Sequence, residues 1–235
     1  MEMLRLDKFL CDANVGSRSQ VKVFLKQGTV KVNGEIIKKP EYKVKEGQDK
    51  VTFQGKEIEY HKYVYYMLNK PKGVVSATKD NLCETVTDLL KDSGYDGLFP
   101  VGRLDKDTEG LLIMTNDGEL AHRLLSPRKH VDKVYYVELD NALTEEGRRL
   151  LETGIDIGEE KLTLPAKAEQ ITDTSLYLTL REGKYHQVKR MLKAVGCQVT
   201  YLKRIGMGGI SLDEHLPCGC YRELTKEERD RVLLQ

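Results

Sequence analysis

Apolar residues near the start of the chain recur with the period of a helix. Between residues 6 and 13 they occupy the i, i+3, i+4 and i+7 positions, which predicts an amphipathic helix. A second helix is predicted to begin at Ser17, because Ser17 and Gln20 fit a capping box. Gly28 is suited to a helix C-terminus and is predicted to end it. The first 28 residues therefore predict two helices.

The pattern then changes to that of strands. Residues 29–32 and 35–37 are rich in valine and isoleucine, and they flank Asn33-Gly34. Asn-Gly is the preferred two-residue turn, because both of its positions need a positive φ. This segment therefore predicts a β-hairpin directly after the second helix.

Residues 51–62 predict a polar strand followed by a connector. The pattern changes after this segment, because residues 64–68 form a continuous β-prone apolar run that is typical of a buried strand. We therefore place a domain boundary near His61. The predicted domains are residues 1–60 and residues 61–235.

The larger predicted domain mixes strands and helices without a repeating parallel unit. That order favours an α+β fold with a mainly antiparallel mixed sheet flanked by helices. The segment Gly206-Met207-Gly208-Gly209 lacks the context of a phosphate-binding loop and is interpreted as a turn. The predicted strands are 64–68, 74–76, 111–115, 133–139 and 175–180, and the predicted helices are 85–90, 119–125, 144–152 and one that follows Gly183.

Composition agrees with two ordinary globular domains. The chain has 235 residues, of which 40% are hydrophobic and 32% charged. No apolar run approaches the roughly 20 residues that a membrane helix needs. Charged residues interrupt the first nine positions, which is untypical of a signal peptide. We therefore expect a cytoplasmic protein without a membrane partner.

The charge is distributed unevenly between the two predicted domains. Residues 1–62 hold 13 Lys/Arg against 9 Asp/Glu, whereas residues 63–235 hold 25 against 28. A small basic domain joined to a near-neutral larger one suits a tether for a polyanion followed by a working domain. Charge alone does not decide this function.

The cysteines do not indicate a disulfide framework or a metal site. There are five, at positions 11, 83, 197, 218 and 220, an odd number without framework spacing, so reduced thiols are expected. His215, Cys218 and Cys220 invite a zinc interpretation. A tetrahedral site needs four ligands, and no second Cys/His cluster follows, so no metal is expected.

Three cations on the second predicted helix are candidates for contact with nucleic acid. Arg18, Lys22 and Lys26 recur every four residues, so each could neutralise one phosphate from the same helix side. The alternative is an ordinary solvated helix face. The surrounding segment RLDKFLCDANVGSRSQVKVFLKQGTVKVNG resembles an S4 RNA-binding domain over roughly residues 3–50. This resemblance favours RNA.

Asp105 is a candidate for chemistry because it lies in a predicted loop that leads into a buried strand. Such a loop can hold a carboxylate in place while leaving it open to substrate. The alternative is that Asp105 only forms turns or caps with its polar neighbours, Asp107, Thr108 and Glu109. The residues alone leave this choice open.

Four segments resemble the motifs of the pseudouridine synthases of the RsuA family. The central one is GRLDKDTEGLLIMTNDG, and LNKPKGVVS, KVYYVEL and EGKYHQVKRM accompany it in the expected order. The resemblance implies an isomerase that detaches uracil from C1′ of its ribose and reattaches it through C5, without cofactor or metal. It also implies that the aspartate of the central motif, Asp105, is the nucleophile.

The resemblance suggests roles for three further residues. Lys189 corresponds to the basic residue of the third motif and would keep Asp105 charged. Tyr135 corresponds to the strand tyrosine that stacks on the loose uracil, whereas Tyr136 should face the other side of the strand. Arg103 would enter the RNA stack and help to flip the uridine out. Help is needed because unstacking the base costs about a few kcal/mol. Lys70 and Arg190 are expected as phosphate contacts.

The expected partner is ribosomal RNA, bound by a monomer. The form Tyr185-His186-Gln187-Val188-Lys189 is closer to family members that modify uridine 516 of 16S rRNA, in conventional numbering, than to those that act on the large subunit. The substrate is expected to be 16S rRNA itself or a small-subunit assembly intermediate that contains it. The alternatives are the same chemistry on 23S rRNA, or an RNA-binding ribosome assembly factor whose isomerase activity is secondary.

Overall fold

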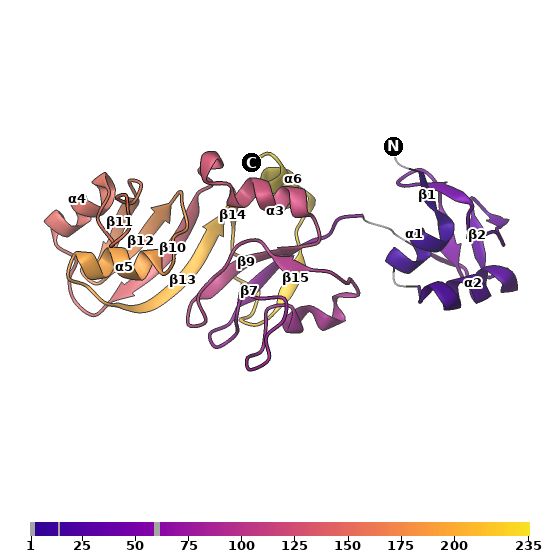
Figure 1. Cartoon of the computed structure of the whole chain (residues 1–235), viewed down its shortest axis with the longest axis horizontal. Helices are drawn as coiled ribbons and strands as arrows, with labels where there is room; N and C mark the ends of the chain where they lie inside the picture. The colour runs from indigo at the N-terminus through magenta and orange to yellow at the C-terminus, as the bar shows by residue number, and fades with distance from the viewer. Residues whose placement is uncertain (1–2, 14, 59–61) are drawn as a thin grey trace. The chain divides into compact units, whose positions relative to one another are not determined.

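The computed structural model describes residues 3–13, 15–58 and 62–235. The chain divides into two compact units, one formed by residues 1–64 with 91–97 and the other by residues 65–90 with 98–235. Figure 1 shows their elements. The predicted boundary near His61 lies outside the described residues, so the limits 1–60 and 61–235 stay a prediction.

The two predicted N-terminal helices are confirmed as α1, Leu6–Asp12, and α2, Arg18–Gln27. The capping box at the start of α2 is complete, because Ser17 and Gln20 each bond the other's backbone N–H. Gly28 ends the helix in the left-handed conformation, with φ 74°. Leu6, Leu10, Val21, Leu25 and other apolar side chains of this unit form its core.

Two small sheets complete the first unit. The predicted hairpin is confirmed, with φ 51° at Asn33 and 88° at Gly34 in its turn. The remaining strand pairs of this unit are also antiparallel. The strands are β1 Met3–Arg5 beside β4 Lys43–Lys45, and β3 Glu35–Ile36, β2 Val30–Val32, β5 Val51–Phe53 and β6 Lys56–Glu57 in that order.

The second unit is built on one large mixed sheet. Its strand order is β11-β12-β10-β13-β9-β7-β15, with β14 beside β13 and β8 beside β9. Among the described pairs, only β9 and β13 run parallel. The strands are β7 Tyr65–Lys70, β8 Phe99–Pro100, β9 Glu109–Thr115, β10 Lys133–Leu139, β11 Lys167–Thr172, β12 Ser175–Leu180, β13 Val199–Met207, β14 Ile210–Ser211 and β15 Tyr221–Glu223.

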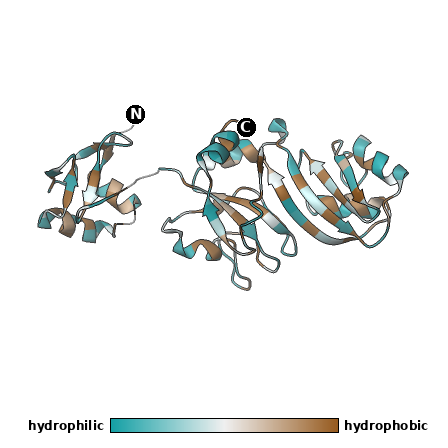
Figure 2. Ribbon diagram, turned by 180° about the vertical axis from the view of Figure 1, so that it is seen from behind, coloured by the Kyte–Doolittle hydropathy of each residue, from teal (hydrophilic) through white to brown (hydrophobic). Residues whose placement is uncertain are grey.

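Helices cover parts of this sheet, which confirms the predicted α+β class. Apolar residues of α3 and α6 join a core with β7, β9 and β14. α5 contacts β13 and lies in front of the sheet in Figure 1, and from behind the same strands have no α5 over them (Figure 2). The helices are η1 Asp88–Ser93, α3 Gly118–Leu125, η2 Pro127–Lys129, α4 Glu145–Thr153, α5 Gln187–Ala194 and α6 Lys226–Leu233.

Three local predictions were wrong. Residues 74–76 form no strand: Val75 makes only an isolated bridge to Thr85, and the Ser76 hydroxyl bonds the backbone of Leu104. The helix predicted at 85–90 is the short 3₁₀ helix η1, which begins at Asp88. Gly206-Met207 belong to strand β13, so the turn consists of Gly208 and Gly209 alone.

The parallel pair β9–β13 joins the two halves of the sheet at Gly110. Gly110 is opposite Arg204 and has φ +103°. A Cβ atom at this position would lie 2.2 Å from the backbone oxygen of Arg204. Only glycine permits this backbone approach. The junction fixes the start of β9, and with it the loop that contains Asp105.

Candidate active site

Asp105 lies in the loop between β8 and β9, and hydrogen bonds hold this loop on both sides of it. Ser76 Oγ donates to the carbonyl of Leu104 at 2.8 Å and accepts from its N–H at 3.0 Å. On the other side, the N–H of Thr108 donates to the carbonyl of Asp105 at 3.1 Å. The backbone is therefore fixed, while 27% of the Asp105 side chain stays exposed.

Helix α5 brings Lys189 to this carboxylate. Lys189 Nζ lies 3.1 Å from Asp105 Oδ2 and donates to Asp107 Oδ1 at 2.5 Å. Burial lowers the pKa of Lys189, but the carboxylates of Asp107 and Asp105 outweigh burial and raise that pKa above its ordinary value. The hydrogen bond from Lys189 also lowers the pKa of Asp107. The structure thus brings Asp105 and Lys189 together, as the sequence predicted.

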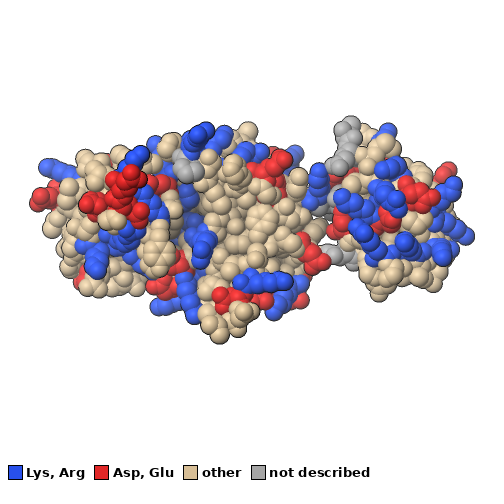
Figure 3. Space-filling view, in the orientation of Figure 1, with Lys and Arg blue, Asp and Glu red and all other residues tan. Residues whose placement is uncertain are grey.

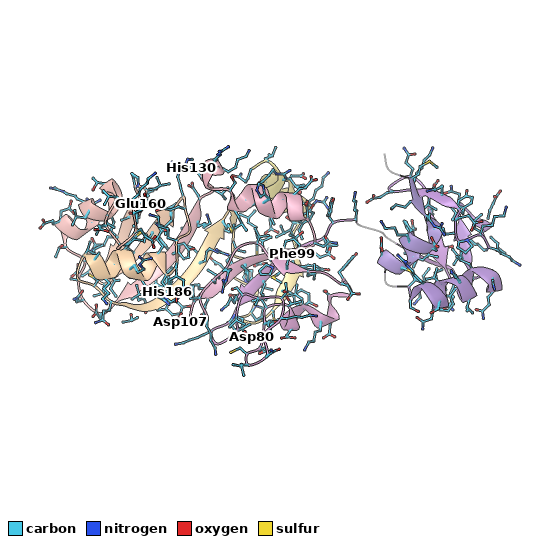
Figure 4. The ribbon with its side chains drawn as sticks, viewed as in Figure 1. Asp80, Phe99, Asp107, His130, Glu160 and His186 are labelled. Carbon is cyan, nitrogen blue, oxygen red and sulfur yellow. The ribbon has the colours of Figure 1, made fainter. Side chains whose placement is uncertain are left out.

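His186 lies near the other oxygen of the same carboxylate, and this residue was not identified from the sequence. Its Nε2 lies 3.5 Å from Asp105 Oδ1. His186 is the N-cap residue of α5, three residues before Lys189, and the side chains of both residues reach Asp105. Figure 4 labels His186 close to Asp107. The spacing of His186 and Lys189 was a signal, but nothing in the sequence showed which helix side faces Asp105.

Lys70 is not available to phosphate in this structure, contrary to the expected RNA contact. It ends strand β7 and is fully buried, and its Nζ donates to the carbonyls of Thr108 at 2.9 Å and Pro71 at 3.0 Å. Burial lowers its pKa to about 8, although the carboxylates of Asp107 and Asp105 oppose this shift. Lys70 therefore supports the loop around Asp105 from inside the fold.

Tyr135 lies on β10, in a row that leads across the sheet to the start of β9. Tyr135 pairs with Arg204 of β13, and Arg204 pairs with Gly110 of β9. Tyr135 is only 9% exposed. Tyr136 faces the opposite side, where its hydroxyl donates to Glu138 Oε1 at 2.9 Å. The two tyrosines therefore face opposite sides of β10, as predicted, while the choice of Tyr135 for contact with substrate stays a prediction.

The remaining predicted RNA contacts differ in how accessible they are. Arg103, two residues before Asp105, is exposed. Arg190 is engaged, because its guanidinium donates to Glu159 Oε1 at 2.6 Å and to the carbonyls of Ile157 and Tyr185. The cations Arg18, Lys22 and Lys26 are exposed on α2 of the first unit. Figure 3 shows Lys and Arg side chains widespread on the visible face of that unit.

The described residues lack a metal-binding cluster and a membrane-spanning helix. No cluster of three or more His, Cys, Asp or Glu side chains among them could hold a metal ion. Within the same residues, no helix is both long and apolar enough to cross a membrane. The five cysteines are free thiols.

This arrangement is suited to nucleophilic chemistry at a cationic centre. A fixed, partly exposed carboxylate can attack an electrophilic carbon. The ammonium of Lys189 lies close enough to neutralise part of the charge of the free carboxylate. Tyr135 lies two strands away from β9 in the sheet.

The family comparisons point to the same chemistry. Residues 64–194 match the model of RNA pseudouridylate synthases, and residues 4–50 match the S4 domain. The chain is 50% identical to the uncharacterized RNA pseudouridine synthase YtzG of Bacillus subtilis, over 96% of both chains. It is 44% identical to ribosomal small subunit pseudouridine synthase A of Vibrio cholerae, over 96% of this chain and 97% of that one.

Further relatives extend the match. Ribosomal small subunit pseudouridine synthase A of Escherichia coli is 41% identical over 96% of this chain and 98% of its own. A crystal structure of a pseudouridylate synthase has a TM-score of 0.70 and 38% identity, and the alignment covers 97% of this chain and 99% of that one. The chain therefore belongs to the RsuA family of pseudouridine synthases, enzymes that isomerise uridine in ribosomal RNA and carry an S4 RNA-binding domain.

Proposed function

We propose that this enzyme converts one uridine of 16S rRNA to pseudouridine, with Asp105 as the nucleophile. The observation that carries the proposal is the contact of Lys189 Nζ with Asp105 Oδ2 at 3.1 Å, between two segments that resemble family motifs. Several of the matched relatives are named ribosomal small subunit pseudouridine synthase A, which supports 16S rRNA as the substrate. Within that RNA we propose uridine 516, on the resemblance of Tyr185-His186-Gln187-Val188-Lys189 to the family members that modify it. The enzyme acts in the cytoplasm as a monomer.

The reaction breaks one bond and forms one. The carboxylate of Asp105 attacks C1′ of the ribose, and the N1–C1′ bond breaks with its electron pair leaving on the uracil ring. The ring turns, and C5 forms the new bond to C1′ as the carboxylate leaves. The proton on C5 is lost, and N1 gains one, so the product is an isomer of the substrate.

Three neighbours support these steps. Lys189 stabilises the carboxylate when it is charged and free of the ribose. Tyr135 stacks on the detached uracil, so that the ring rotates in place and does not leave. Arg103, exposed two residues before Asp105, occupies the space that the flipped uridine leaves in the RNA.

The S4 domain supplies affinity that does not depend on the reaction. Arg18, Lys22 and Lys26 project from one side of α2 and bind phosphates of the same RNA. Arg190 would reach phosphate only by exchanging its present partners, Glu159 and the neighbouring carbonyls. Lys70 supports the catalytic loop and has no direct contact with RNA.

A map of pseudouridines in ribosomal RNA tests this function. RNA from a deletion strain, from the same strain with the wild-type gene and from one with Asp105→Asn would be mapped chemically. We expect one 16S pseudouridine, at position 516, to disappear on deletion and to return only with the wild-type gene. Loss of a 23S pseudouridine would overturn the target. Growth restored fully by Asp105→Asn would favour the assembly-factor role.

A further inference from the structure

Tyr185 presents an aromatic ring to solvent immediately before α5. It is 75% exposed, whereas Tyr42, Tyr63 and Tyr177 are 38–39% exposed. A large aromatic side chain left this open, at the edge of a site for RNA, is a candidate for contact with a base.

The ring of Tyr185 is held in one orientation. It stacks on the imidazole of His186, with ring centroids 3.8 Å apart and an angle of 18° between the planes. One face of the tyrosine is therefore covered and the other is free. The Tyr185 carbonyl accepts from Arg190 Nη1 at 3.1 Å, and Arg190 is fixed in turn by Glu159.

His186 connects this stack to the reacting carboxylate. Its backbone has φ 49°, a left-handed conformation that is unfavourable for an L residue and persists only where the surroundings enforce it. In that conformation its Nε2 lies 3.5 Å from Asp105 Oδ1 while its ring lies on Tyr185. The imidazole of His186 thus contacts both Asp105 and the ring of Tyr185, whose other face is free.

We propose that the free face of Tyr185 stacks on an RNA base that neighbours the target uridine. This proposal rests on the proposed function of Asp105. When a uridine is flipped out, the bases beside it lose a stacking partner. An aromatic side chain fixed beside the site replaces that partner without reading the sequence, because every base has a π face. Tyr185 in this way lowers the free energy of the flipped complex and helps to position the RNA.

Binding measurements test the stack without turnover. All proteins would carry Asp105→Asn, and the probe would be a 16S rRNA fragment that contains uridine 516, with either neighbouring nucleotide made abasic in turn. With intact RNA, we expect Tyr185→Ala to raise Kd by about 5- to 100-fold, the range of one lost base–aromatic stack. Tyr185→Phe should stay within about threefold, since it keeps the ring.

The abasic probes identify the partner. With one of the two abasic RNAs, Tyr185→Ala and its parent should bind equally, because the base that stacks is missing. Tyr177→Ala, on strand β12, is the matched control and should bind the intact RNA and both abasic RNAs like the parent. Thermal unfolding of each variant would show that the fold is retained.

Two results would overturn the stack. One is a Tyr185→Ala variant that binds intact RNA like its parent. The other is an equal loss of affinity on intact RNA and on both abasic RNAs, which would indicate contact with the target uridine or with the backbone. A wild-type enzyme that forms no pseudouridine would contradict the proposed function of Asp105 instead, and the binding comparison would still report on Tyr185.

Discussion

Lys189 Nζ and Asp105 Oδ2 lie 3.1 Å apart, although one belongs to α5 and the other to the loop before β9. Each side chain is 27% exposed, so the pair is neither buried nor fully solvated. A pair at this depth is positioned by the fold and remains within reach of a substrate. The contact depends on the β9–β13 junction and on the packing of α5 against β13.

Removing the cation should slow the chemical step. We expect Lys189→Met to lower kcat about 10²- to 10³-fold, because Asp105 and Asp107 would face each other without the ammonium that now contacts both. Lys189→Arg keeps the charge and should retain more activity than Lys189→Met. Single-turnover rates would be compared with Lys193→Met, an exposed lysine of the same helix. A Lys189→Met rate within about threefold of wild type would refute this role.

Lys70 should make stability depend on pH in a defined direction. Burial lowers its pKa in the folded state to about 8, below its ordinary value of 10.5. Between these values the unfolded chain holds a proton that the folded chain has lost, so the free energy of unfolding rises with pH. From pH 7 to 9.5 this contribution grows by up to about 2 kcal/mol.

The comparison with Lys70→Met isolates this effect, because every other titrating group is shared. Urea unfolding at both pH values should show the wild type gaining stability relative to the variant as pH rises. The variant also loses the bonds to Thr108 and Pro71, so its single-turnover rate should fall as well. A stability difference that does not change with pH would mean that the ammonium stays protonated.

Gly110→Ala should disrupt the junction between the two halves of the sheet. The added Cβ would lie 2.2 Å from the Arg204 carbonyl oxygen, at φ +103°. We expect the free energy of unfolding to fall by about 2–4 kcal/mol and Tm by roughly 5–15 °C. Activity should fall as well, because the Asp105 loop shifts. Gly118→Ala is the control, since no atom lies within 4 Å of its Cβ position. Equal Tm values for the two variants would contradict the tight approach.

The cations of α2 should contribute to RNA affinity in a salt-dependent way. Replacing Arg18, Lys22 and Lys26 together with Gln should make the slope of log K against log salt concentration shallower by about 2–3. The rate of the bound complex should stay unchanged. Replacing Lys129, Lys167 and Lys226, exposed on the larger unit, gives the control. An unchanged slope in the α2 variant would assign these cations to a solvated face.

Elements whose structure is determined by neighbouring residues could be predicted from local sequence patterns. The capping box of Ser17 and Gln20 and the turn at Asn33-Gly34 could be predicted because their bonds are made within a few residues. The strand Lys133–Leu139 was predicted with its exact limits, since its apolar and polar positions alternate.

Contacts distant in sequence could not be predicted in the same way. Strand β13 was not predicted, because Lys203 and Arg204 interrupt its apolar pattern. Arg204 is nevertheless 1% exposed, and its Nε donates to the carbonyl of Leu111 at 2.8 Å. Lys70 was expected at the surface because it is charged. In the structure a carbonyl of a distant loop accepts a hydrogen bond from its ammonium. Charge in the sequence indicates a surface position only when no buried partner exists.

In the candidate site, too, some residues could be identified from the sequence and others only from the structure. Asp105 and Lys189 were identified through motifs, and the structure then brought them together. The spacing of His186 and Lys189 was not enough to identify His186, because its left-handed backbone and its distance of 3.5 Å from Asp105 are visible only in the structure. Whether Tyr135 stacks on the uracil depends on a bound substrate and stays a prediction.

The most direct test of Asp105 is tritium release from an rRNA fragment labelled at C5 of the target uridine. Forming the C1′–C5 bond expels the C5 hydrogen, so each turnover releases one tritium. With enzyme in excess, we expect wild type to release the label fully, and Asp105→Asn to release none while binding the RNA with nearly the same Kd. Tritium release by Asp105→Asn at the wild-type rate would contradict the assignment of Asp105 as the nucleophile.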